Sequence, residues 1–211
     1  MSVGILGGTF DPIHNGHVAA AAAAQDTLGL DTISLIPSHI PPHRHDPVGA
    51  TGEQRFEMAR LAAAEHPGWS ASRIELDREG PSYTYDTLVT LQGSQIFFIT
   101  GADAFAEIAT WSRYPDVLGL ANFVVVSRPG ITLNSIRERV PSAFRNHPPC
   151  SPSDFRVLVS EKPRVILVEA HTPDISSTDI RRRVRAGHSL SGFVPDSVAR
   201  FIAEHRLYSG H

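Results

Sequence analysis

The sequence predicts an α/β protein built on a doubly wound parallel sheet, with a small helical part at its C-terminal end. Short apolar runs alternate with helical patterns along the chain, which is typical of parallel strands joined by crossover helices. Several runs lead into loops rich in glycine, proline and polar residues. The length of 211 residues suits one domain. We therefore expect a single domain over residues 1–211, with the helical part beginning at about residue 175.

The first part of the chain predicts two strands and two helices. SVGIL (2–6) is an apolar run of the length of a buried strand. The alanines of 18–28 strongly favour a helix, which Gly29 ends. TISLIP (32–37) is the next strand, and a helical pattern over 53–65 follows a loop dense in proline and histidine.

The middle of the chain continues this alternation. SASRIELD (70–77) is compatible with a strand, and a helix over 85–91 follows another loop. QIFFIT (95–100) is a strongly apolar strand, after which residues 103–108 have a helical pattern. NFVVVSRPG (122–130) predicts a strand that ends in a turn.

The last part is less regular. Residues 131–164 contain five prolines and indicate a short helix followed by loop, whereas RVILVEA (164–170) predicts a strand. Two helices are expected over 177–186 and 196–206. Ligands of open parallel sheets bind beyond the carboxyl ends of the strands. We therefore expect the loops GGTFDP, PSHIPPH, TGAD and SRPG, which follow four apolar strands, to share one crevice.

Composition excludes several classes of protein. Hydrophobic residues make up 41% and charged residues 19%, which is a globular composition, and the net charge of −3 favours neither nucleic acid nor an anionic membrane as partner. A single cysteine, Cys150, excludes an intrachain disulfide and fits a reducing cytoplasm. We find neither a signal segment nor the roughly 20 apolar residues that span a bilayer. Any phosphate binding must therefore come from a local site in a cytoplasmic protein.

Two glycines, Gly7 and Gly8, follow the first strand. Glycines at this position allow backbone N–H groups to approach a phosphate, and the positive end of the next helix favours an anion. The stretch does not fit the dinucleotide-binding pattern or the P-loop, which need further glycines or a GKS/GKT sequence. On its own, the glycine pair is a weak signal.

Two histidines make this signal more specific. His14 and His17 are three residues apart, which places them on one helical face, and Gly16 between them leaves room for a ligand. Protonated imidazoles beside a polyphosphate can donate hydrogen bonds from both nitrogens. The alternative is an ordinary helix start with Asp11 as N-cap and Pro12 at the first position. A metal site is less favoured, because no third ligand is close in sequence.

A second candidate anion site lies in ISSTDIR (175–181). Ser176 and Asp179 have capping-box spacing, so a helix begins here with free N–H groups. The hydroxyls of Ser176, Ser177 and Thr178, together with Arg181, would complete the site. The alternative is a plain capped helix with a solvated basic face. The neighbouring arginines are expected at the surface: Arg182, Arg183 and Arg185.

Further candidates follow the other strands. His43 and Arg44 offer positive charge after the second strand, although an ordinary surface loop would look the same. In GAD, Gly101 permits a close approach and Asp103 could accept hydrogen bonds from ribose hydroxyls or act as an N-cap. A helix start at Thr84 could bind a carboxylate. Trp111 lies in ATWSRYP, and a tryptophan at such a place usually belongs to the core or to an interface.

GGTFDPIHNGH resembles the signature of the nucleotidyltransferase family, whose shared core is HxGH, and is similar most of all to the bacterial nicotinate-mononucleotide adenylyltransferases. ISSTDIR matches that family's ISSTxIR motif at every specified position. The two motifs lie about 160 residues apart, and finding both in this order is more specific than either alone. The resemblance spans nearly the whole chain and is weakest over residues 131–164.

The resemblance implies a role for each matching residue. His14 and His17 would be catalytic, stabilising charge on the triphosphate. The residues that would bind ATP are Gly7, Gly8, Thr9, Phe10, His14, Gly16, His17, Gly101, Asp103, Ser176, Ser177, Thr178 and Arg181. Those that would bind nicotinate mononucleotide are Thr9, His43, Arg44, Thr84, Trp111 and Arg128. Around Thr84 the chain would hold the carboxylate, and the Trp111 indole would stack on the ring.

The resemblance further implies an adenylyltransferase of NAD biosynthesis, which joins ATP and nicotinate mononucleotide to give nicotinate adenine dinucleotide and pyrophosphate. Mg²⁺ would be held mainly by ATP phosphates rather than by a protein metal site. A homo-oligomer is compatible with the sequence. The alternatives are a relative with another phosphorylated acceptor, such as phosphopantetheine or nicotinamide mononucleotide, and a non-catalytic nucleotide sensor.

Overall fold

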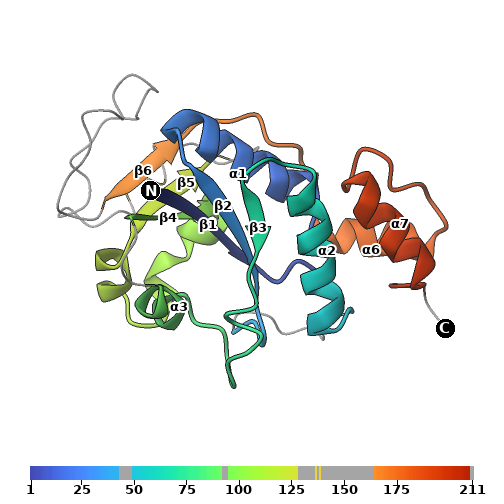
Figure 1. Cartoon of the computed structure of the whole chain (residues 1–211), viewed down its shortest axis with the longest axis horizontal. Coiled ribbons are helices and arrows are strands. Elements are labelled where there is room, and N and C mark those ends of the chain that lie inside the picture. Colours follow the sequence, from blue (N-terminus) through green and yellow to red (C-terminus); the bar gives the residue numbers. More distant parts are fainter. Residues whose placement is uncertain (43–48, 92–94, 128–135, 137, 139–163, 210–211) are drawn as a thin grey trace. The chain divides into compact units, whose positions relative to one another are not determined.

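The structure is a computed structural model that describes residues 1–42, 49–91, 95–127, 136, 138 and 164–209 (Figure 1). The strands are β1 (Ser2–Gly8), β2 (Thr32–Pro37), β3 (Trp69–Ala71), β4 (Gln95–Gly101), β5 (Asn122–Val126) and β6 (Val165–Val168). The α-helices are α1 (Asn15–Leu28), α2 (Gly52–Ala64), α3 (Thr84–Thr90), α4 (Ala102–Ala106), α6 (Ser177–Arg185) and α7 (Asp196–Glu204). Two short 3₁₀ helices are η1 (Ile108–Thr110) and η2 (Asp116–Gly119).

The six strands form one sheet in the order β3-β2-β1-β4-β5-β6. The pairs β1–β4, β4–β5 and β5–β6 are parallel, with Leu6 opposite Ile99 and Gly101 opposite Val126. This order is that of the Rossmann-like, doubly wound sheet. Strands are added outward on one side from β1 to β3 and on the other side from β4 to β6, so the strand order reverses between β1 and β4. The predicted fold class is therefore confirmed. In such sheets the point of reversal, at the carboxyl ends of the strands, is where ligands bind.

The central strands are buried because both faces of a parallel sheet are covered. Five consecutive residues of β4, from Ile96 to Thr100, are buried, and Phe98 packs on Phe123 of β5 with ring centroids 5.4 Å apart. In β1, a Cβ atom on Gly4 would lie 2.5 Å from the side chain of Ile33. Gly4 therefore allows the neighbouring apolar side chains to close over the strand.

The residues group into two compact units. Unit 1 comprises Met1–Gly7, Ala20–Ile33 and Tyr83–Thr172, and unit 2 comprises Gly8–Ala19, Ser34–Ser82 and Pro173–His211. In unit 2, α2 packs on α7, and Glu65 accepts a hydrogen bond of 2.6 Å from the Ser197 hydroxyl. α2 begins with a capping box in which Thr51 and Gln54 satisfy each other's backbone amides. That residues 1–211 form one domain stays a prediction.

Most predicted elements are present, with ends shifted by a few residues. The strand predicted over 70–77 is wrong beyond Ala71, because the amide of Asp77 donates to the carbonyl of Arg73 (2.9 Å) and closes a turn. Arg73 is also held by a two-fold ion pair with Glu53 of α2. Most of 131–164, including Cys150, lies outside the described residues.

Candidate active site

The chain turns sharply after β1. Phe10 is buried and has a φ of 51°, a left-handed conformation that a bulky residue rarely adopts. Its ring folds back over Gly8, where a Cβ atom would lie 2.8 Å from Phe10 Cε1. Gly8 is thus required by the packing of Phe10, which is a different reason from the close approach to phosphate that the sequence suggested.

His14 and His17 lie against each other at the start of α1. Their ring centroids are 3.6 Å apart with 23° between the planes, and the Phe10 ring meets His17 edge-on at 5.1 Å. The amide of His14 donates to Nδ1 of His17 (3.2 Å), and the amide of His17 lies 3.4 Å from Nδ1 of His14. A ring nitrogen that accepts from an amide carries no proton, so the proton of each neutral ring is on Nε2.

This arrangement changes the expected chemistry of the pair. Each Nδ1 accepts from the backbone, so hydrogen bonds to a ligand would be donated from Nε2, and not from both nitrogens as the sequence suggested. His14 is 2% exposed, whereas His17 is only half-buried. His17 is therefore the histidine better placed to meet a ligand.

Gly16 makes room for the His14 ring. A Cβ atom at this position would lie 3.0 Å from His14 Nδ1 and 3.4 Å from the carbonyl oxygen of Pro173. Gly16→Ala is therefore expected to push the imidazole aside and lower kcat/KM for ATP about tenfold or more in a pyrophosphate-release assay. Gly119→Ala is the matched control, because its Cβ would have no neighbour within 4 Å. Equal kinetics for both variants would contradict the assigned role of Gly16.

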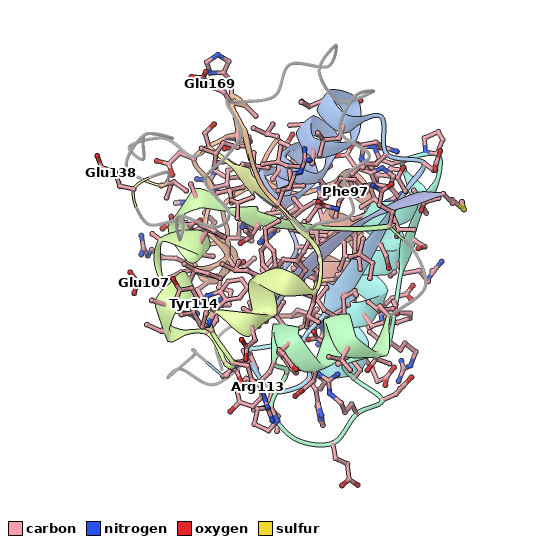
Figure 2. The ribbon with its side chains drawn as sticks, turned by 90° about the vertical axis from the view of Figure 1, so that its left-hand side faces the viewer. Phe97, Glu107, Arg113, Tyr114, Glu138 and Glu169 are labelled. Carbon is pink, nitrogen blue, oxygen red and sulfur yellow. The ribbon has the colours of Figure 1, made fainter. Side chains whose placement is uncertain are left out.

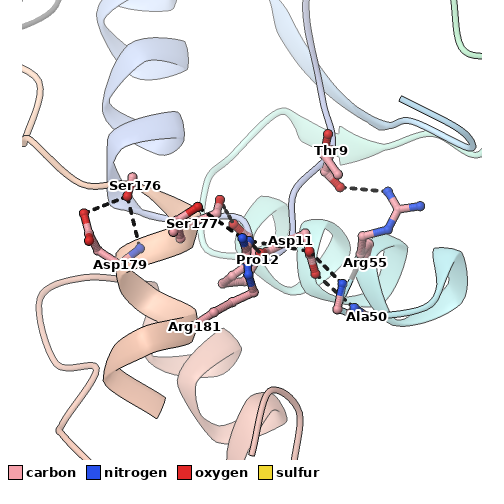
Figure 3. A network of polar contacts seen from close by, with 11 residues as sticks. Thr9, Asp11, Pro12, Ala50, Arg55, Ser176, Ser177, Asp179 and Arg181 are labelled. Atoms are coloured by element: carbon pink, nitrogen blue, oxygen red, sulfur yellow. Dashed lines mark hydrogen bonds and ion pairs between the residues drawn. The ribbon is translucent and has the colours of Figure 1, made fainter. Parts of the chain in front are cut away.

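The second motif folds as a capped helix and binds to the first motif (Figure 3). Ser176 is the N-cap of α6, with its Oγ accepting from the amide of Asp179 at 3.1 Å, as the spacing predicted. The Ser177 hydroxyl donates to the carbonyl of Pro12 at 2.9 Å. Arg181 Nη1 donates to the carbonyl of Asp11 at 2.7 Å. Two motifs about 160 residues apart in sequence therefore meet at residues 11 and 12.

Most polar side chains of the second motif are occupied within the protein. Ser176 Oγ also donates to the Asp179 carboxylate (2.7 Å), and Thr178 Oγ1 accepts from Arg181 Nη2 (3.1 Å). The sequence predicts that these hydroxyls bind an anion. In the structure they shape the start of α6, whose backbone N–H groups carry the positive end of the helix dipole.

Asp11 does not cap α1, so the alternative interpretation of the first motif is wrong. The residue is 1% exposed, and its carboxylate accepts from the amides of Gly49 (2.9 Å) and Ala50 (3.0 Å). Arg181 Nη1 lies 3.5 Å from the same carboxylate. Asp11 is thus a buried anion that connects the first motif to two other segments of unit 2.

Arg55 of α2 is a further residue that the sequence analysis missed. It is 2% exposed, and its guanidinium donates to the carbonyls of Thr9 (2.7 Å) and His39 (3.3 Å). The sequence signal for Arg55 was its spacing. Met58 and Ala59 follow it by three and four residues, which places all three on the buried face of α2. A buried arginine on an apolar stripe indicates a partner elsewhere in the chain.

In unit 1, two segments carry the candidates for the nicotinate group. Thr84 is the first residue of α3, as predicted, and Trp111 follows η1. The Trp111 indole is half-buried and meets Phe98 edge-on at 6.1 Å. The Arg113 guanidinium lies 5.2 Å from the centroid of the Tyr85 ring, and this cation–π contact links the two segments. Arg113 is labelled among the side chains of Figure 2.

The chain passes from β4 directly into α4, which differs from the expected loop. Gly101 is the N-cap of α4, and Asp103 is the second residue of that helix, so Asp103 is not an N-cap aspartate. Its side chain is at an exposed position in the first turn, where a carboxylate is favoured by the helix dipole. The contact with a ribose stays a prediction.

His43, Arg44 and Arg128 lie outside the described residues, and the shared crevice of the four loops stays a prediction. Within the described part of the chain, no group of three or more His, Cys, Asp or Glu side chains is placed to hold a metal ion. None of the helices in that part has the length and apolar character needed to cross a membrane.

The Rossmann-like sheet and the two motifs are the features expected of a nucleotidyltransferase. The chain belongs to the cytidylyltransferase-like family, whose model matches residues 5–183. It is 40% identical over 212 residues to a probable nicotinate-nucleotide adenylyltransferase of Geobacter sp. (strain M21), covering 99% of this chain and 98% of that protein. A protein of the same name from Roseiflexus sp. (strain RS-1) is 42% identical over 211 residues, covering 98% and 97%. The resemblance found in the sequence is therefore confirmed.

Solved structures show the same fold. The nicotinic acid mononucleotide adenylyltransferase of Plasmodium falciparum, complexed with NaAD, superposes with a TM-score of 0.72 at 16% identity, covering 98% of this chain and 97% of that one. A putative nicotinate-nucleotide adenylyltransferase of Vibrio parahaemolyticus gives a TM-score of 0.60 at 17% identity, covering 100% and 96%. At these identities the likeness concerns the fold.

Proposed function

We propose that this chain transfers the adenylyl group of ATP to nicotinate mononucleotide and so catalyses a step of NAD biosynthesis. The observation that carries the proposal is the junction of the two motifs, where Ser177 and Arg181 bond to Pro12 and Asp11 beside the paired histidines. Sequence identity of 40% to nicotinate-nucleotide adenylyltransferases, over nearly their whole length, supports the choice of substrates.

The reaction needs positioning and charge stabilisation rather than a covalent nucleophile. The 5′-phosphate oxygen of the mononucleotide attacks the α-phosphorus of ATP, the bond from this phosphorus to the oxygen bridging to the β-phosphate breaks, and pyrophosphate leaves. A phosphate monoester has a second pKa of about 6, so the attacking oxygen is ionised at neutral pH and needs no general base. The protein must bring two anions together and stabilise the leaving group.

The described residues can be assigned to these tasks. His17 donates from Nε2 to the triphosphate, with His14 stacked behind it, and the α6 N–H groups with Arg181 hold the β- and γ-phosphates. Gly101 and Asp103 hold the adenosine. Thr84 and Trp111 hold the nicotinate. The remaining assignments rest on the resemblance alone: Gly7, Thr9, His43, Arg44 and Arg128.

Mg²⁺ would neutralise charge on the phosphates when it is bound. Asp11, the carboxylate next to the motif junction, does not fit as its ligand, because two amides and Arg181 already surround it. We keep the expectation that the ion is held mainly by ATP oxygens, and we derive no step through it.

Pyrophosphate release with each acceptor in turn tests the proposal. Purified protein with ATP and Mg²⁺ is expected to release pyrophosphate with nicotinate mononucleotide at a higher kcat/KM than with nicotinamide mononucleotide or phosphopantetheine. Faster release with phosphopantetheine would identify a relative with another acceptor. Binding of ATP without release with any acceptor would identify a nucleotide sensor.

Trp111→Ala is expected to raise the KM for nicotinate mononucleotide about tenfold and leave the KM for ATP nearly unchanged. Stacking of an aromatic side chain on a base contributes about 1–3 kcal/mol, and only the mononucleotide would lose it. Trp69→Ala is the matched control, since Trp69 stacks on His66 with ring centroids 4.3 Å apart. An equal rise of both KM values in the Trp111 variant would show that the nicotinate is placed wrongly.

A further inference from the structure

Tyr208, which follows α7, is held in an unusual conformation. Its φ is 63°, and that of Arg206 is 51°, so two non-glycine residues in three adopt the left-handed region. Such a backbone costs free energy and persists only where the surrounding packing fixes it. In line with this, Leu207 between them is 7% exposed, and the Tyr208 hydroxyl oxygen is inaccessible to solvent.

The phenol of Tyr208 lies near the charged groups at the junction of the two motifs, namely Asp11, Arg181 and Arg55. Burial raises the pKa of Tyr208 well above its usual value, and the charge and hydrogen-bonding of Asp11 raise it further, against the opposing charges of Arg181 and Arg55. The geometry agrees, because the Asp11 carboxylate accepts from the amide of Gly49 (2.9 Å), and the Tyr208 ring borders the same glycine.

The Tyr208 ring and the Arg181 side chain both border Gly49. A Cβ atom on Gly49 would lie 2.9 Å from Tyr208 Cδ1 and 3.4 Å from Arg181 Cδ. Asp11 holds the guanidinium of the same arginine through its carbonyl (2.7 Å) and its carboxylate (3.5 Å). The Arg181 side chain is 12% exposed, and its direction is set by these neighbours together with Thr178, whose Oγ1 accepts from Nη2 (3.1 Å).

We propose that Asp11 and Tyr208 are positioning residues that hold Arg181 in its phosphate-binding orientation. The inference rests on the proposed function for the role of Arg181. Neither residue needs to touch the nucleotide. Asp11 holds the guanidinium of Arg181, and Tyr208 lies beside the aliphatic part of that side chain and interacts with Asp11.

A purely electrostatic role of Asp11 predicts the opposite result from a positioning role. Asp11→Asn removes a negative charge 3.5 Å from Arg181. If Asp11 only neutralised the arginine, a triphosphate would then bind more tightly, because the local potential would become more positive. If Asp11 positions the arginine, the triphosphate binds more weakly. The sign of the change therefore separates the two roles.

The test measures Kd values for ATP and for inorganic tripolyphosphate by calorimetry. Asp11→Asn is expected to weaken both about tenfold, and Tyr208→Phe and Gly49→Ala severalfold, since they disturb the same arginine by losing a hydroxyl or by adding a methyl group. In an Arg181→Ala background, Asp11→Asn is expected to cause no further loss. Arg182→Ala, whose side chain is 72% exposed, is the control with unchanged affinity.

The proposal would be overturned if Asp11→Asn and Tyr208→Phe bound ATP and tripolyphosphate as tightly as the wild type or more tightly. It would also be overturned if their losses of affinity added to that of Arg181→Ala. If Asp11→Asn does not fold, Tyr208→Phe and Gly49→Ala decide, because they change no charge. Wild-type protein that binds ATP but releases no pyrophosphate would refute the proposed function and leave the positioning role standing. Wild-type protein that binds neither ATP nor tripolyphosphate would overturn both.

Discussion

His17→Ala is expected to lower kcat for pyrophosphate release roughly 10²-fold or more, while the Kd of ATP changes little. The amide of His14 donates a hydrogen bond to Nδ1 of His17, which leaves Nε2 as the proton-bearing nitrogen of the neutral ring. A donor fixed in this way costs no reorganisation when negative charge develops on the phosphates. Steady-state kcat and calorimetric ATP binding together check the prediction.

His66→Ala is the matched control for this variant. Like His17→Ala, this variant removes a stacked imidazole from unit 2, because the His66 ring stacks on Trp69. His66 belongs to neither motif. The variant is expected to leave kcat within a factor of about two, since a surface stacking contact contributes little. A normal kcat in His17→Ala, or an equal fall in His66→Ala, would refute the catalytic role of His17.

Arg181→Ala is expected to reduce both nucleotide use and stability. Under the proposed function Arg181 binds phosphate, so its loss is expected to lower kcat/KM for ATP roughly 10²-fold. The variant also removes a cation from beside the buried Asp11 carboxylate, which costs about 2 kcal/mol of unfolding free energy. Steady-state kinetics and urea denaturation measure the two effects.

The adjacent arginine provides the comparison. Arg182 pairs with Asp179 at 3.0 Å, but its side chain is 72% exposed, and exposed pairs contribute at most about 1 kcal/mol. Arg182→Ala is expected to leave kcat/KM unchanged and to lower stability by less than about 0.5 kcal/mol. If the two arginine variants behaved alike, the helix would act only through its total charge, and the specific role of Arg181 would be wrong.

Much of the sheet could be predicted because its central strands are buried on both faces and therefore appear as unbroken apolar runs. The prediction over 70–77 failed because RIELD (73–77) alternates polar and apolar residues like a strand but forms a turn. Arg73 pairs with Asp77, four residues later, and with Glu53, twenty residues earlier. Only the first of these pairs lies within the segment, and the second depends on the fold.

The candidate site divides in the same way. His14, Gly16 and His17, like Ser176 and Arg181, could be found because their spacing forms short motifs. Asp11 and Tyr208 could not be assigned, since their roles depend on partners brought together by the fold: Asp11 bonds to Gly49 and Arg181, 38 and 170 residues away. The resemblance to a family supplied candidate residues for the site and left the side chains around them unassigned.

The junction between the motifs also has a consequence for biosynthesis. Ser177 and Arg181 bond to residues that precede them by 165 and 170 positions. During translation the first motif leaves the ribosome long before its partner helix has been made. The nascent chain can therefore build its early strands and α1, but it completes the junction between the motifs only when synthesis is nearly finished.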